Sequence, residues 1–122
     1  MTNFEQLADQ YIALWNETDD ATRRKLVDEV WAEDAVYTDP LVVAAGREAF
    51  AATIGAVQSQ FPGLVFTLGE GGVDAHHNIA RLTWDLGPAG QEALVVGFDV
   101  LVATEDGKIA AVHGFLDKVP TA

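Results

Sequence analysis

Apolar residues change their spacing near the middle of the chain. In residues 4–17 and 21–31 they return every three or four positions, which predicts two amphipathic helices. Residues 46–60 repeat this pattern until Pro62 and Gly63 interrupt it, which predicts a third helix. From residue 64 onward apolar and polar residues alternate, as in strands whose two faces differ. The alternation predicts four strands, over residues 64–70, 78–86, 92–103 and 108–116.

A short strand is predicted between the second and third helices. Glu33 and Asp34 are expected to close the second helix. The strand then covers residues 36–39 and stops at Pro40, because proline cannot donate to a ladder. Helices followed by a meander of strands indicate an α+β fold, and 122 residues suit a single domain, residues 1–122. Connections between the later strands are expected at residues 71–74, 87–90 and 104–107.

Composition excludes several classes of function. The formal net charge is −12 with seven Lys and Arg, which argues against nucleic acid as a partner because phosphate binding depends on basic residues. There is no cysteine, so disulfides, thiolate metal sites and cysteine nucleophiles are excluded. No apolar run approaches the roughly 18 to 20 residues of a membrane span, and residues 1–5 do not start like a signal peptide. We expect a cytoplasmic protein with no membrane partner.

An aspartate interrupts the most apolar predicted strand. Asp99 lies within residues 93–103, where an ionised carboxylate is costly unless it is paired, hydrogen-bonded or kept neutral by a raised pKa. A neutral carboxylic acid can donate a hydrogen bond, which is a catalytic tool. Tyr11 on the apolar face of the first helix and Asp39 among Val and Leu residues are two further polar groups in apolar surroundings. These three residues are the candidate catalytic groups.

Each candidate also has a structural explanation. Asp39 precedes a proline and suits a turn or a helix cap, and Tyr11 suits a core position where its hydroxyl finds a backbone partner. Asp99 could form an ion pair with Arg81. Strand register argues against that pair, because it places Arg81 and His113 on the face opposite to Asp99.

The same register predicts the neighbours of Asp99. A four-residue loop at residues 104–107 places Asp99 opposite Val112, and a two-residue turn places it opposite Gly114, with the same facing. The reverse face carries Val96, Phe98 and other apolar residues. Three helices can cover only one face of the sheet, so a homodimer packed through the outer sheet face is expected.

Other chemistries fit the sequence less well. Ser59 is the single serine and has no histidine near it in sequence, which disfavours a serine nucleophile. His76 and His77 would point to opposite sides of a regular strand and could not chelate one metal, so no metal site is expected. The glycines at positions 69, 71 and 72 precede no helix, which disfavours a phosphate-binding loop.

The order of elements resembles a known superfamily. Three helices, a short strand ending in Asp39 and Pro40, and a curved four-stranded meander are similar to the nuclear-transport-factor-2-like superfamily. Residues 33–40, followed by residues 46–50, most resemble its ketosteroid isomerase and SnoaL-like polyketide cyclase branches. The resemblance implies a cone-shaped, curved, mostly antiparallel mixed sheet wrapped by three N-terminal helices, with a pocket enclosed between them.

The resemblance also implies roles for the three candidates. Tyr11 corresponds to the oxyanion tyrosine of the isomerases, Asp39 to their general base, and Asp99 to their protonated aspartic acid. Trp31 and Ile54 stand where some isomerases have supporting tyrosines. No cofactor is implied. The expected substrate-binding wall consists of Trp15, Phe66, Leu82, Trp84, Leu86, Val95, Val112 and Leu116.

The function expected from these residues is acid/base proton transfer on a small apolar carbonyl compound, as in a ketosteroid isomerase or a polyketide cyclase. Isomerisation and ring closure share their first step, so the sequence does not separate them. Two alternatives remain open. One is a non-catalytic ligand-binding or dimerisation module, and the other is an epoxide hydrolase or dehydratase, which would need Arg81 or His113 in the pocket.

Overall fold

The described part of the chain folds into three helices and six strands. The structure, a computed structural model, describes residues 2–120. The first half contains helix α1 (Phe4–Asn16), helix α2 (Asp20–Val30), strand β1 (Trp31–Thr38), strand β2 (Val43–Ala45) and helix α3 (Arg47–Gln60). The second half contains strands β3 (Val65–His76), β4 (Ile79–Gly87), β5 (Val95–Ala103) and β6 (Ile109–Lys118).

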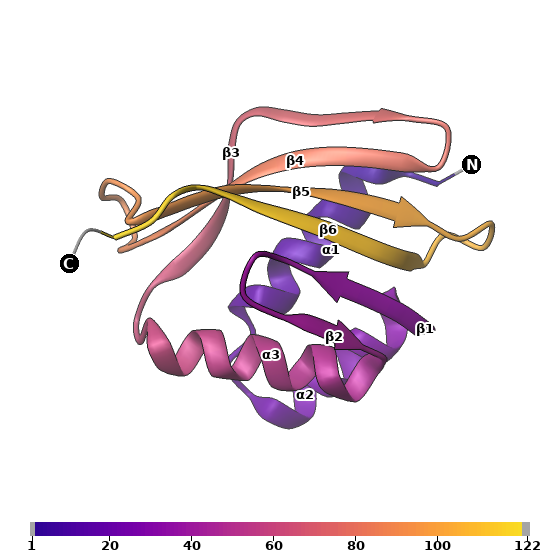
Figure 1. The fold of residues 1–122 in the computed structure, drawn as a ribbon, viewed down its shortest axis with the longest axis horizontal. Coiled ribbons are helices and arrows are strands. Elements are labelled where there is room, and N and C mark those ends of the chain that lie inside the picture. Colours follow the sequence, from indigo (N-terminus) through magenta and orange to yellow (C-terminus); the bar gives the residue numbers. More distant parts are fainter. Residues whose placement is uncertain (1, 121–122) are drawn as a thin grey trace.

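All six strands belong to one curved, open sheet with the order β2-β1-β6-β5-β4-β3. Strands β3 to β6 form an antiparallel meander, and β1 joins it by pairing parallel to β6. Figure 1 shows α1 behind the meander and α3 along the lower side, below the β1–β2 hairpin. This arrangement confirms the predicted α+β fold, in which the helices cover one face of the sheet.

Local side-chain contacts start the first two helices where the sequence predicts them. The side chain of Asn3 accepts a hydrogen bond from the backbone N–H of Gln6 at 3.1 Å. The side chain of Asp19 accepts one from the backbone N–H of Thr22 at 3.0 Å. Each bond satisfies an amide that the first helical turn leaves without a partner.

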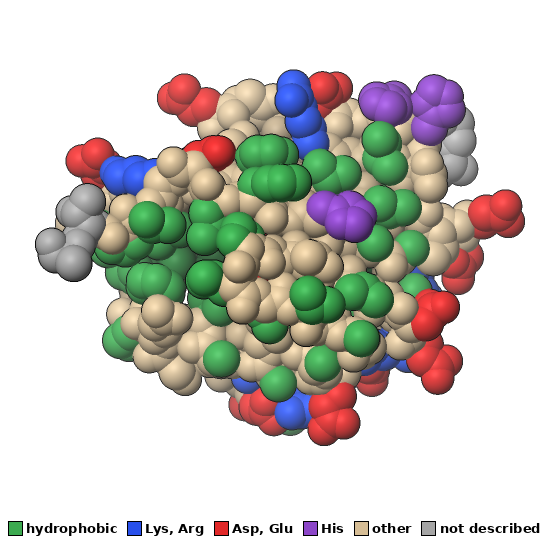
Figure 2. Space-filling model, in the orientation of Figure 1, with side chains coloured by type: hydrophobic (Ala, Val, Ile, Leu, Met, Phe, Trp, Pro, Cys, Tyr) green, Lys and Arg blue, Asp and Glu red, His purple; other side chains and the backbone are tan. Residues whose placement is uncertain are grey.

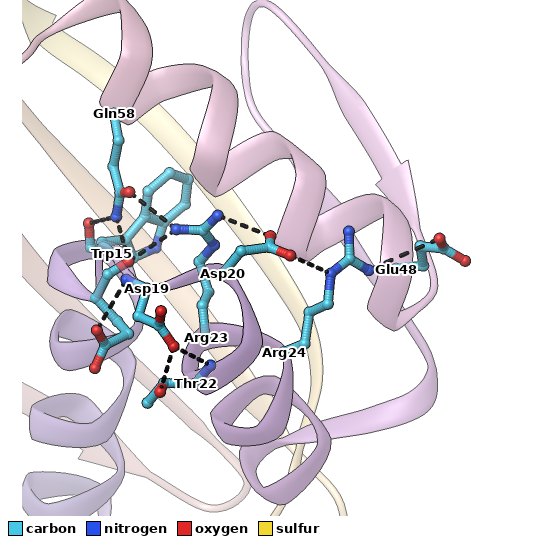
Figure 3. A network of polar contacts seen from close by, with 9 residues as sticks. Trp15, Asp19, Asp20, Thr22, Arg23, Arg24, Glu48 and Gln58 are labelled. Carbon is cyan, nitrogen blue, oxygen red and sulfur yellow. Dashed lines mark hydrogen bonds and ion pairs between the residues drawn. The ribbon is translucent and has the colours of Figure 1, made fainter.

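The buried side chain of Arg23 connects the three helices (Figure 3). Arg23 Nη1 donates to the carbonyl of Glu17 at 2.9 Å and to Gln58 Oε1 at 3.0 Å, and Nη2 donates to Asp20 at 3.1 Å. Gln58 Nε2 in turn donates to the carbonyls of Trp15 and Glu17, at 2.9 and 2.8 Å. The network fixes the C-terminal end of α1, and with it Trp15, against α3.

Strand β1 is longer than predicted and begins at once after α2. Trp31 already has extended backbone angles and pairs with Ile109 of β6, and the strand continues through Glu33 and Asp34. The prediction that these two acids end the helix was therefore wrong. Pairing with β6 is a long-range contact that local sequence does not reveal, and for the same reason β2 was missed.

Strand β3 is also longer than predicted, because it passes through the glycines expected to form a turn. Gly71 and Gly72 have φ angles of 94° and 63°, and the register between β3 and β4 shifts at this point, which is a β-bulge. The chain reverses at His77 and Asn78 instead. His77 has a φ of 53°, so the pair does not follow regular strand geometry. His76 Nδ1 and His77 Nδ1 lie 3.2 Å apart, which corrects the expectation that these side chains point away from each other.

The outer face of the sheet carries apolar side chains that no helix covers. Phe98 of β5 and Phe115 of β6 are paired in register and stack with centroids 4.8 Å apart. Phe115 is 49% exposed. Figure 2 shows hydrophobic side chains gathered over this face, with a histidine among them.

Candidate active site

A cavity of about 240 Å³ lies between the helices and the covered face of the sheet. It is open at one end, and hydrophobic side chains line the hollow seen at the left of Figure 2. Helices α1 and α3, the β1–β2 turn and strands β3 to β6 all contribute to its wall. All three candidate catalytic residues, Tyr11, Asp39 and Asp99, line this one cavity.

Asp99 is held at the inner wall by two donors. Burial alternates along β5, so Asp99 faces inward and is only 3% exposed. Tyr11 Oη lies 2.7 Å from Asp99 Oδ2, and Trp84 Nε1 lies 3.1 Å from Asp99 Oδ1. The register pairs Asp99 with Leu82 and with Gly114, which confirms the predicted facing and the second of the two predicted pairings.

Burial raises the pKa values of both Asp99 and Tyr11. Desolvation raises the pKa of Asp99 to about 6, and the nearby Asp39 carboxyl adds to the increase, while the bonds from Tyr11 and Trp84 oppose it. Desolvation also raises the pKa of Tyr11 well above its ordinary value, and the Asp99 carboxyl reinforces this. Tyr11 therefore keeps its proton, and Asp99 changes its protonation close to neutral pH.

Asp39 is fixed in the turn that follows β1. Its Oδ1 accepts hydrogen bonds from the backbone N–H groups of Leu41 and Val42, at 2.8 and 2.9 Å. Its own N–H donates to the carbonyl of Val42 at 3.0 Å. This is the turn chemistry expected of an aspartate before a proline. The turn orients the carboxyl so that Oδ2 remains available to other groups.

Tyr37 is a site residue that sequence reasoning missed. Its hydroxyl donates to Asp39 Oδ2 at 2.7 Å, and its ring packs against Trp15 and Phe50. Desolvation raises the pKa of Tyr37 far above its ordinary value, with smaller contributions from Asp99 and Asp39. The available signal was the two-residue separation from Asp39, because residues i and i+2 of a strand share a face.

Gly114 lies against the side chains of both acids. A Cβ atom there would lie 2.8 Å from Asp99 Oδ1 and 3.4 Å from the Cβ of Asp39. The two acids thus flank one glycine on the cavity floor. Both side chains also line the same cavity, as expected of two groups that act on one small molecule.

The predicted substrate-binding residues divide into two groups. Leu82 and Val112 are fully buried in the core and are not part of the cavity wall. Both positions face inward as predicted. Those that do line it are Trp15, Phe66, Trp84, Leu86, Val95 and Leu116.

Residues 2–120 contain no group of three or more His, Asp or Glu side chains arranged to hold a metal ion. Over the same residues, no helix is both long and apolar enough to cross a membrane.

Sequence comparison assigns the chain to a family. The SnoaL-like domain profile matches residues 8–112. The chain belongs to the SnoaL-like family. A crystal structure from Agrobacterium tumefaciens strain C58, named as a candidate isomerase of this family, is 40% identical over 92% of this chain and 95% of its own, with a TM-score of 0.87. No curated protein matches this SnoaL-like chain.

More distant structures share the fold. A candidate ketosteroid isomerase from Kribbella flavida is 18% identical, covers 97% of this chain and 80% of its own, and has a TM-score of 0.68. A candidate SnoaL-like polyketide cyclase from Jannaschia sp. CCS1 is 17% identical, covers 92% and 85%, and has a TM-score of 0.70. At this level of identity the likeness supports the NTF2-like fold, which the confirmed element order already indicates.

Proposed function

We propose that this protein catalyses proton transfer on a small, apolar carbonyl compound, as an isomerase or a cyclase of the SnoaL-like family. The observation that carries the proposal is that the side chains of Asp39 and Asp99 lie together against Gly114 in the wall of one cavity. The surrounding wall is mostly apolar and aromatic, as expected for a cavity that excludes water from an acid/base step.

The two acids have different surroundings and therefore different proposed roles. Asp39 Oδ2 takes a proton from the carbon next to the carbonyl group. The electron pair of that C–H bond moves onto the carbonyl oxygen, which becomes an enolate. The proposed donors to this oxygen are the neutral form of Asp99, present below its pKa of about 6, and Tyr11, whose hydroxyl turns to the oxygen from Asp99 Oδ2. Return of the proton to another carbon gives an isomer, and attack of the carbanion on a second carbonyl of the same molecule closes a ring.

Substitutions at the three residues test these roles. Asp39→Asn keeps the shape of the base but removes its basic oxygen, so turnover should fall by at least the roughly 10² to 10⁴ that general-base catalysis supplies. A phenol imitates the enolate, and its affinity should survive this change. Tyr11→Phe and Asp99→Ala should instead weaken phenol binding, measured at pH 5, where Asp99 holds its proton.

Full activity of Asp39→Asn on a turned-over substrate would exclude the proposed base. If all three variants bind phenols as the parent does, the protein is better described as a ligand-binding or dimerisation module. The same measurements therefore separate the enzyme from its non-catalytic alternative.

The epoxide hydrolase or dehydratase alternative gains no support. Arg81 is exposed on the outer face and pairs with Asp74 at 3.5 Å, and His113 is also exposed. Neither residue lines the cavity that holds Asp39 and Asp99.

A homodimer through the outer sheet face is the second part of the proposal. The stacked pair of Phe98 and Phe115 would be buried against its copy, which would remove exposed aromatic surface from water. The partner implied by the cavity is a small apolar carbonyl compound.

A further inference from the structure

Trp84 lies across strand β5 because its partner on that strand, Gly97, has no side chain. The β4–β5 register pairs the two residues. A Cβ atom at Gly97 would come within 2.5 Å of Cζ2 and 2.9 Å of Cε2 of the indole, and it would also collide with the backbone carbonyl oxygen of Phe115. The indole therefore occupies this place only over a glycine. From there its Nε1 reaches Asp99 Oδ1 at 3.1 Å.

The two hydrogen bonds to Asp99 make it an acceptor at neutral pH. Burial raises its pKa to about 6, and the bonds from Tyr11 and Trp84 keep it from rising further, because they stabilise the ionised form. Above this value each carboxylate oxygen has accepted one hydrogen bond and keeps a lone pair for another. A ligand group that binds the ionised Asp99 must therefore be the hydrogen-bond donor.

We propose that Trp84 is a specificity-determining residue of this cavity. By holding Asp99 as a hydrogen-bond acceptor, it favours ligands that donate a hydrogen at that point, and the class that fits best is a protonated amine on a small flat ring system. The inference rests on the proposed function for the location of the ligand site, and it does not depend on turnover. It concerns the ionised form of Asp99, whereas the proposed proton transfer uses the neutral form that is present at lower pH.

The charged and titratable groups around Asp99 favour a cation. Tyr11 faces it from α1, Tyr37 and Asp39 from β1 and its turn, and Gly114 of β6 adds no side chain. No Lys, Arg or His is among the residues that line the described cavity. A protonated amine would thus be attracted by two carboxyl groups without competition from a protein cation.

The walls of the cavity suit the remainder of such a ligand. The rings of Trp15, Phe66 and Trp84 form a continuous aromatic surface, with neighbouring centroids 5.4 and 5.6 Å apart. Aromatic faces attract ammonium groups as well as flat apolar rings. A volume of about 240 Å³ is below the usual range of about 300 to 1,000 Å³ for drug-sized ligands, which indicates one or two rings.

A matched pair of ligands tests the preference directly. 2-Acetylnaphthalene and 1-(2-naphthyl)ethylamine share a skeleton, but the ketone can only accept a hydrogen bond and the protonated amine can only donate. Calorimetric titration of the parent at pH 7.5 should show the amine binding at least about tenfold more tightly, as expected for a hydrogen bond that is also an ion pair.

Removing the indole N–H should reduce that preference. Trp84→Phe removes this donor but keeps a flat ring. It should lower the ratio of amine to ketone affinity by about tenfold, because Asp99 then retains its proton to higher pH and can donate to the ketone. The pH at which ketone binding declines should rise in this variant.

Trp31→Phe is the matched control. Trp31 is buried, its Nε1 has no hydrogen-bond partner among the described residues, and it does not line the cavity. This variant should keep the parent's preference. The proposal is overturned if the parent binds neither ligand, if it prefers the ketone at pH 7.5, or if folded Trp84→Phe keeps the parent's ratio. If Asp39→Asn keeps full turnover while the parent still prefers the amine, the proposed function is wrong and the specificity proposal stands.

Discussion

The hydroxyl group of Tyr11 donates to Asp99 Oδ2 across 2.7 Å, and this bond joins residues 88 positions apart in the sequence. Tyr11 has no exposed surface and Asp99 has almost none. Because both groups are buried, Tyr11 depends on Asp99 for a hydrogen-bond partner, and Asp99 depends on Tyr11 and Trp84. The bond therefore couples the stability of the packing between α1 and the sheet to the protonation state of Asp99.

Replacing Tyr11 with Phe should lower the free energy of unfolding by about 1 to 3 kcal/mol at pH 7.5, because the buried carboxylate loses a donor. The pKa of Asp99 should rise for the same reason. Chemical denaturation and carboxyl-carbon NMR measure the two effects. A double-mutant cycle with Asp99→Asn is the control, and additive losses in that cycle would show that the two side chains are not coupled.

Replacing Tyr37 with Phe should reduce kcat by about 10- to 100-fold and leave KM nearly unchanged, because Asp39 Oδ2 loses the donor that orients it. Steady-state kinetics on a turned-over substrate give both values. The matched variant is Tyr11→Phe, which removes the other tyrosine hydroxyl of the cavity and should also weaken phenol binding. An unchanged kcat in Tyr37→Phe would show that the turn alone positions Asp39.

The stability of the protein should depend on pH through Asp99. Its pKa is about 6 in the folded state against an ordinary value of 3.8, so the fold prefers the neutral acid. Its stabilising contribution is complete below about pH 4 and is lost as the pH rises through about 6, with a loss of at most about 3 kcal/mol. Denaturation curves of the parent and Asp99→Asn between pH 4 and 8 isolate this contribution. Parallel curves would mean that Asp99 does not titrate in this range.

Replacing Phe98 with Glu should produce monomers or insoluble protein, because a charge would then lie in the proposed dimer interface. Light scattering gives the mass. Ala13→Glu, on the exposed side of α1 and remote from that face, is the control and should keep the parent's mass. A dimer of unchanged mass in the Phe98 variant would place the interface elsewhere.

The periodicity of the chain was sufficient to predict its main elements and the facing of the site. Helical spacing located α1, α2 and α3 to within a few residues, and alternation placed Asp99 and Trp84 on the same face of the sheet. These features are local, since each depends on residues that repeat over one or two turns or along one strand. Sequence also marked Asp99 as a polar group in apolar surroundings, without naming its partners.

Pairing between elements distant in sequence determined the strand lengths and site contacts that periodicity did not predict. Strand β1 extends to Trp31 because β6 lies beside it, and the glycines of β3 form a bulge because β4 continues past them. The hydrogen bonds of Asp99 likewise required α1 and β4 to meet at one point of β5, over a glycine that leaves room for an indole. Contacts of this kind depend on the packing of elements distant in sequence, so only the tertiary structure determined which groups control the charge in the cavity.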